Sequence, residues 1–142
     1  MVIAENGVVT RSDRQRLRQM IDSLCAALPV NGAPHRGFLA GLKERLGQMA
    51  TVAQEHVDAD VVTMNSRVRV SDASDREQVL TLVYDSDADL FGEKVSVVSA
   101  LGAAVLGSRV GDEVEWQTRR GPRRLRIEEI VFQPEAAGTF GL

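Results

Sequence analysis

The spacing of apolar residues changes once along this chain, and that change constrains the fold more than any other feature. Up to about residue 53 the apolar residues recur at steps of three and four, as on one face of an α-helix. From about residue 61 they alternate with polar residues, as on one face of a β-strand. The chain is therefore expected to form helices first and a sheet second, which is an α+β fold.

Two amphipathic helices are predicted within residues 1–57. Their apolar stripes are Leu17, Met20, Ile21, Leu24, Cys25 and Leu28, and then Leu39, Leu42, Leu46, Met49 and Ala53. The first helix is expected to begin after Thr10 or Ser12, because Ser12 and Gln15 have the spacing of a capping box. A segment rich in proline and glycine, residues 29–34, separates the helices. Two helices with so short a connection are predicted to pack antiparallel as a helical hairpin, a short coiled coil.

Residues 58–142 are predicted to form a second domain with an antiparallel sheet and one helix. The strand-like segments are residues 62–70, 79–84, 95–99, 114–118 and 125–132. The basic segment 119–124 is typical of a hairpin turn. The predicted helix, residues 100–106, is rich in alanine and glycine, so it can lie close on a sheet, and Gly107 suits its carboxyl end.

Composition and charge exclude several classes of protein. The net charge is −3, divided into +2 over residues 1–57 and −5 over the rest, so the chain lacks the basic character of a nucleic-acid-binding protein. DNA binding is thus left uncertain, and no sequence-specific contact with nucleic acid is expected. Cys25 is the single cysteine, and no apolar run reaches the roughly 18 residues of a membrane span. A cytoplasmic location is therefore expected.

Several segments together resemble a known family. They are the strand 95–99, the small-residue helix 100–107, the following segment 109–115, the opening 61–68 and the tail 133–138. Their order is similar to that of the C-terminal domain of the bacterial Gre transcription elongation factors, and in particular to the branch of the regulators of nucleoside diphosphate kinase. The resemblance implies a fold like that of the FK506-binding proteins, binding to RNA polymerase, and no enzymatic activity. Ala100 departs from the family pattern, which usually has proline after the strand serine.

The resemblance also implies a mode of action. Gre factors insert a long coiled coil through the secondary channel of RNA polymerase, and acidic residues at its tip help to hold a catalytic magnesium ion. Residues 29–35 of this chain contain no Asp or Glu, and Asp22 and Glu44 are the nearest carboxylates. The chain is therefore expected to dock at the secondary-channel rim and compete with Gre factors without stimulating transcript cleavage. No catalytic residue, metal ion or cofactor is expected.

Six residues are predicted to contact the polymerase. They are Asp85, Asp87 and Asp89 in an acidic turn, and Ser99, Ala100 and Leu101 at the strand–helix junction. The acidic turn begins like a calcium-binding EF-hand loop. However, Leu90 stands where that loop needs glycine, and Ser96 where it needs glutamate. A calcium site is therefore not predicted.

Two other functions stay open at this point. The chain could regulate nucleoside diphosphate kinase, either by contacting the enzyme or by altering its level. It could instead be a dimeric scaffold in which the stripe from Leu39 to Met49 pairs between two chains.

Overall fold

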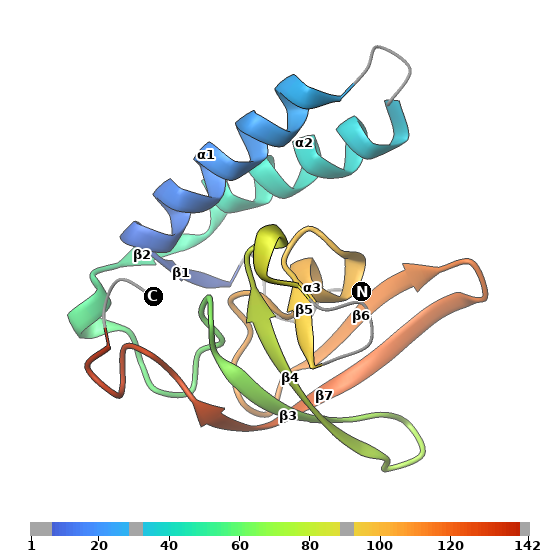
Figure 1. The fold of residues 1–142 in the computed structure, drawn as a ribbon. Coiled ribbons are helices and arrows are strands. Elements are labelled where there is room, and N and C mark those ends of the chain that lie inside the picture. The colour runs from blue at the N-terminus through green and yellow to red at the C-terminus, as the bar shows by residue number, and fades with distance from the viewer. Residues whose placement is uncertain (1–6, 29–32, 89–92, 140–142) are drawn as a thin grey trace.

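Two long helices project together from the rest of the molecule. The computed structural model describes residues 7–28, 33–88 and 93–139 of the chain. Helices α1 (Arg11–Ala27) and α2 (Ala33–Gln48) lie side by side and antiparallel (Figure 1), and we call them the helical pair. The backbone N–H of Asp13 donates a hydrogen bond of 3.1 Å to Oγ1 of Thr10, which caps α1. The helix thus begins directly after Thr10, and the capping box expected at Ser12 is wrong.

The apolar stripes of the two helices are buried over most of their predicted length. Leu17 and Ile21 of α1 are fully buried, as is Leu46 of α2. The second stripe ends earlier than predicted, because α2 stops at Gln48 and Ala53 lies beyond it, next to the short 3₁₀ helix η1 (Gln54–His56).

A two-stranded parallel sheet forms the base of the helical pair. It consists of β1 (Val8–Thr10) and β2 (Ala50–Val52). The sequence analysis missed both strands, because three residues are too few to show an alternating pattern. The backbone N–H of Val8 also donates to the carbonyl of Gly107 at 3.3 Å, which joins this base to the second half of the chain.

The second half forms a curled five-stranded sheet (Figure 1). Its strands are β3 (Arg67–Ser71), β4 (Glu77–Val83), β5 (Lys94–Ser96), β6 (Glu113–Thr118) and β7 (Gly121–Phe132), in the order β5-β4-β3-β7-β6. Three of the pairs are antiparallel, but β4 and β5 are parallel. The prediction of a wholly antiparallel sheet is therefore wrong at this pair, where the connection must carry the chain back along the sheet. Register shifts between β3 and β7 bend the sheet.

Helix α3 (Ala100–Val105) lies between the sheet and the helical pair (Figure 1). It packs very close to the sheet, since a Cβ atom added at Gly102 would lie 1.9 Å from the carbonyl oxygen of Ser96. This confirms that the small residues of the segment serve close packing. Gly107, with φ of +80°, follows the helix end.

One hydrophobic core runs from the helical pair through α3 into the sheet. Leu17 and Leu46 belong to the same buried cluster as Leu106 and Ile127. The structure thus shows a mixed fold of three helices and a curled sheet. The coiled-coil and FK506-binding-protein-like assignments, and the division after residue 57, stay predictions.

Candidate partner-binding surface

The first three residues of the predicted acidic turn form the 3₁₀ turn η2 (Asp85–Asp87), which Tyr84 joins to β4. Asp85 and Asp87 are both exposed. The Ser96 hydroxyl donates a hydrogen bond of 3.1 Å to Oδ1 of Asp85, which ties the turn to β5. Asp89 lies outside the residues that the structure describes. The turn thus presents at least two carboxylates on a fixed part of the surface.

The strand–helix junction is held by Ser99, the N-cap of α3. Its Oγ accepts a hydrogen bond from the Gly102 N–H at 3.0 Å and donates one to the Ser96 carbonyl at 2.7 Å. Because the hydroxyl is used twice within the chain, Ser99 shapes the junction. Ala100 is exposed and Leu101 is half-buried, so these two present the junction to the surroundings.

The predicted contact residues that the structure describes do not form one patch. Asp85 and Asp87 line a hollow of about 480 Å³ that faces α1, with Arg16 on its wall. Ala100 lines a cleft of about 450 Å³ on the side of α2, and Leu101 lines a third, smaller hollow beside Leu125. The structure brings Asp85 close to the strand leading into α3. It places Asp85 and Asp87, Ala100, and Leu101 in three separate hollows.

Two sets of side-chain hydrogen bonds, which we call joints, connect the described residues of the helical pair to the second half of the chain. Arg45 of α2 forms the first. Its guanidinium donates to the carbonyl of Ala103 through Nη1 and to that of Leu106 through Nη2 at 2.8 Å. These carbonyls lie at the carboxyl end of α3, where a cation satisfies unpaired acceptors. Burial lowers the pKa of Arg45. The sequence analysis gave Arg45 no role, because nothing in the sequence shows which carbonyls it meets.

Replacing Arg45 with methionine is expected to weaken this joint. The apolar stem of the side chain would remain, but two carbonyls would lose a charged donor, which is expected to cost about 2–3 kcal/mol of unfolding free energy. Urea unfolding monitored by circular dichroism measures this loss, with Lys43→Met on the same helix as a control. A loss for Arg45→Met no larger than that of the control would contradict the role of Arg45.

Asp13 of α1 forms the second joint. Its carboxylate is buried, with only 4% of the residue exposed, and accepts hydrogen bonds from the Met64 N–H at 3.2 Å and the Tyr84 hydroxyl at 3.4 Å. Burial is the main cause that raises its pKa, from 3.8 to about 6, and the nearby Glu135 adds to the rise. Arg16 lies over the Tyr84 ring, 4.5 Å from its centre. Burial also raises the pKa of Tyr84, and the charge of Asp13 adds to this rise.

Two of the segments that carry the sequence resemblance, the opening 61–68 and the tail 133–138, contact each other in the structure. The buried side chain of Gln133 donates to the carbonyls of Asp58 and Val61, each at 2.8 Å. The Thr63 hydroxyl donates to Glu135 at 2.6 Å. The opening and the tail of the second half are therefore fastened to each other, which explains why both carry distinctive residues.

The basic hairpin turn and Cys25 lie apart from these features. Arg124 pairs with Glu115 at 2.9 Å, and Arg119 and Arg120 are exposed at the turn between β6 and β7. Cys25 is half-buried, less enclosed than its place in the stripe suggested. Among the described residues no group of three His, Cys, Asp or Glu side chains is arranged to hold a metal ion. Within the same residues, no helix is long and apolar enough to cross a bilayer.

Comparison with known proteins identifies the family. Residues 57–132 match the family model described as transcription elongation factor GreA/GreB, C-terminal. The regulator of nucleoside diphosphate kinase of Escherichia coli K12 is 35% identical over 136 residues, which are 94% of each chain. Transcription elongation factor GreA of Thermoanaerobacter pseudethanolicus is 35% identical over 95 residues, 66% of this chain and 60% of that protein.

A solved structure agrees with these matches. The GreA/GreB transcription elongation factor from Nitrosomonas europaea is 34% identical, with a TM-score of 0.69 over 89% of this chain and 98% of the other. The likeness therefore includes the helical pair as well as the sheet. The chain belongs to the GreA/GreB transcription elongation factor family, in the branch of the regulators of nucleoside diphosphate kinase.

Proposed function

We propose that this protein is a regulator that docks on RNA polymerase at the rim of the secondary channel and competes there with Gre factors. The observation that carries the proposal is the extent of the family likeness. It covers 98% of the Nitrosomonas europaea GreA/GreB structure, and hence both the part that would dock and the part that would enter the channel. In this proposal residues 58–142 form a docking domain with the FK506-binding-protein-like fold, and residues 1–57 form a short coiled coil.

In this proposal the helical pair does not support transcript cleavage, because it is short and because the segment that connects its two helices lacks carboxylates. Helix α1 has 17 residues, which at 1.5 Å per residue gives an arm of about 25 Å. Residues 29–35 contain no Asp or Glu. Asp22 of α1 forms an ion pair of 2.6 Å with Lys43 of α2. This pair lies along the two helices and not at residues 29–35, so Asp22 is not a carboxylate at the end of the helical pair. An arm of this kind would occupy the channel entrance without supplying a magnesium ligand.

The acidic turn supplies the strongest candidates for polymerase contact. Reversing two exposed charges, Asp85→Lys with Asp87→Lys, is expected to weaken binding to core RNA polymerase at least tenfold. The two carboxylates are proposed to face a basic surface of the polymerase, and the lysines would be repelled by it. Among the described residues the two side chains make one hydrogen bond, the exposed one from Ser96 to Asp85, so the fold should persist. Fluorescence anisotropy of the labelled protein with purified core polymerase measures the affinity.

A second double variant controls for net charge. Glu55→Lys with Glu113→Lys makes the same charge change at exposed positions in η1 and β6. If the two double variants bind polymerase equally well, Asp85 and Asp87 are not contacts. A single variant at Ala100, Ala100→Glu, tests the junction in the same assay.

The kinase-linked function is a second candidate, favoured by the name of the Escherichia coli relative. Co-purification of the kinase with this protein from cells, after polymerase has been removed, would support direct contact. The dimeric scaffold is not favoured, because Leu39, Leu42, Leu46 and Met49 are each at most 5% exposed within one chain. That stripe is already covered by the protein's own residues.

A further inference from the structure

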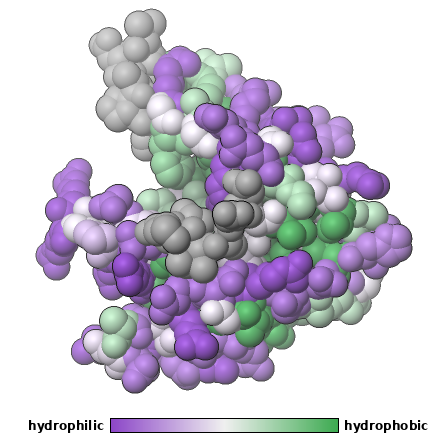
Figure 2. Space-filling model, turned by 180° about the vertical axis from the view of Figure 1, so that it is seen from behind, coloured by the Kyte–Doolittle hydropathy of each residue, from purple (hydrophilic) through white to green (hydrophobic). Residues whose placement is uncertain are grey.

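Three arginines line a hollow beside α1, which we call the arginine hollow. Hydrophilic residues gather over much of the helical pair on the face shown in Figure 2. The hollow has a volume of about 380 Å³, within the roughly 300–1,000 Å³ of ligand sites. Arg11, Arg14 and Arg18 follow one another at steps of three and four residues, which places them along one face of the helix. Uncharged polar side chains of α1 and β2 also line it, namely Gln15, Gln19 and Thr51.

The positive charge of the arginine hollow is not neutralised by the described part of the chain. Within residues 7–28, 33–88 and 93–139 none of its three arginines has an ion-pair or hydrogen-bond partner. Asp22 also lines the hollow, but it is already paired with Lys43 at 2.6 Å. Like charges three and four residues apart repel each other and disfavour the helix. The stability of α1 therefore does not account for the three arginines, whereas an anion bound between them does.

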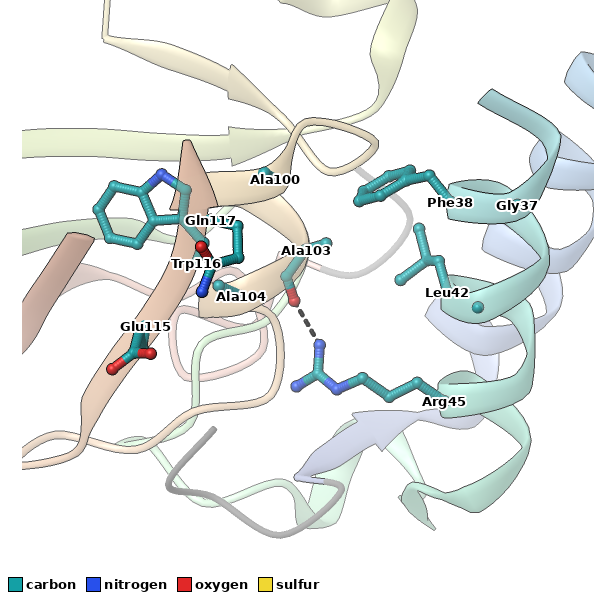
Figure 3. A pocket seen from close by; sticks show the side chains of 11 residues that line it. Gly37, Phe38, Leu42, Arg45, Ala100, Ala103, Ala104, Glu115, Trp116 and Gln117 are labelled. Atoms are coloured by element: carbon teal, nitrogen blue, oxygen red, sulfur yellow. Dashed lines mark hydrogen bonds between the residues drawn. The ribbon is translucent and has the colours of Figure 1, made fainter. Parts of the chain in front are cut away.

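Arg18 reaches from α1 toward α2. A Cβ atom added at Gly47 would lie 3.6 Å from its Nη2. Its Nε is buried and has no hydrogen-bond partner among the described residues, which is unfavourable for a charged donor. Arg45 is the contrasting case, because its guanidinium points across to α3 and donates to the carbonyl of Ala103 (Figure 3). The guanidinium of Arg18 thus lacks the acceptors that the chain gives to Arg45.

The chemistry of the arginine hollow favours a short anion with several phosphate groups. Guanidinium groups bind phosphate oxygens in pairs, through two parallel hydrogen bonds. The three arginines span seven residues of helix, or about 10 Å, which suits a short ligand. No aromatic side chain is among the described residues that line the hollow, whereas single-stranded nucleic acids bind by stacking their bases on aromatic rings. The net charge of −3 also disfavours a long polyanion.

We propose that the arginine hollow binds the oligophosphate group of a small anion, either a nucleoside triphosphate or inorganic polyphosphate. Arg14 and Arg18, which are half-buried, would bind neighbouring phosphates, and the exposed Arg11 would bind the outer end of the group. The hollow does not include Asp85 or Asp87. The proposal therefore does not depend on the polymerase contact proposed above, and either can fail without the other.

Isothermal titration calorimetry at low ionic strength, with EDTA present, tests the proposal with sodium tripolyphosphate, GTP and GMP. Tripolyphosphate is expected to bind saturably at one site with micromolar affinity and to raise the melting temperature. GMP should bind at least tenfold more weakly, because one phosphate engages fewer guanidinium groups. The two triphosphates distinguish the sources. Equal binding identifies the phosphate chain alone as the ligand, and tenfold tighter binding of GTP identifies a nucleotide.

Arg14→Gln with Arg18→Gln is the decisive variant. It should weaken tripolyphosphate binding at least tenfold and keep the fold, because glutamine is a good helix former, and circular dichroism checks this. Arg119→Gln with Arg120→Gln removes the same charge at exposed positions of the turn between β6 and β7, and should leave binding unchanged. Arg18→Lys keeps the charge but loses the planar fork, so it should also weaken binding.

Four results would overturn the proposal. The first is no saturable binding of tripolyphosphate at millimolar concentration, and the second is equal binding by the two double variants. The third is a glutamate oligopeptide that binds as tightly as tripolyphosphate, which would show a site for acidic protein segments. The fourth is a single-stranded RNA oligonucleotide that binds at least tenfold more tightly than tripolyphosphate, which would show a site for a nucleic-acid strand.

Discussion

Replacing Gly102 with alanine is expected to destabilise the protein by about 3 kcal/mol or more. The added Cβ would lie 1.9 Å from the carbonyl oxygen of Ser96 and 2.9 Å from Cα of Val97, both of which are backbone atoms. The Ser96 carbonyl cannot move freely, because it accepts hydrogen bonds from the Ser99 hydroxyl and the Ser99 N–H. The helix α3 must therefore shift away from β5, which opens the core beneath it.

Gly41→Ala is the matched control, since it makes the same change in a helix where the new methyl group meets open space. It is expected to stabilise the protein by up to about 1 kcal/mol, through helix propensity alone. Urea unfolding of both variants gives the two free energies. Effects of the same sign, or a loss below about 1 kcal/mol for Gly102→Ala, would show that α3 does not pack on β5 as described.

The stability of the protein is expected to rise as the pH falls from 7 to 4, through Asp13. Its pKa is raised by burial from 3.8 to about 6 in the folded protein, so folding favours the protonated carboxyl. The stabilisation is fully present below pH 3.8 and is lost as the pH rises through about 6. The shift of about two pKa units corresponds to about 3 kcal/mol over the whole window, most of it between pH 4 and pH 6.

Comparison with Asp13→Asn isolates this effect from other titrating groups. Asp72 acts in the opposite direction, because hydrogen bonds from the Arg76 and Ser74 N–H groups lower its pKa, but it is the same in both proteins. Unfolding free energies are measured at a series of pH values for both proteins. As the pH falls, the unfolding free energy of the wild-type protein should increase relative to that of Asp13→Asn. Parallel pH profiles for the two proteins would mean that Asp13 titrates as an ordinary exposed carboxyl.

The sequence predicted features that depend on local pattern. The two apolar stripes, one containing Leu17 and the other Leu46, located the two helices, since periodicity reports which face is buried. The small residues around Gly102 predicted a helix lying close on a sheet. The order of strand, helix and tail led to the family, which the comparisons confirm.

Features that depend on contacts between distant segments were not predictable. The joints made by Arg45 and Asp13 connect residues 51 or more positions apart, and many Arg and Asp residues of this chain look alike in sequence. The parallel pairing of β4 and β5 depends on the path of the connection, which alternation does not report. The cleft between α2 and α3 depends on how the two helices pack, which the spacing of apolar residues along the chain does not report.

Binding of the purified protein to core RNA polymerase, with GreA added as a competitor and transcript cleavage followed in the same samples, is the measurement that decides the proposed function. Saturable binding that GreA displaces, together with inhibition of GreA-stimulated cleavage and no cleavage by the protein alone, is the expected result. Absence of binding at micromolar protein, or cleavage stimulated by the protein itself, would contradict it.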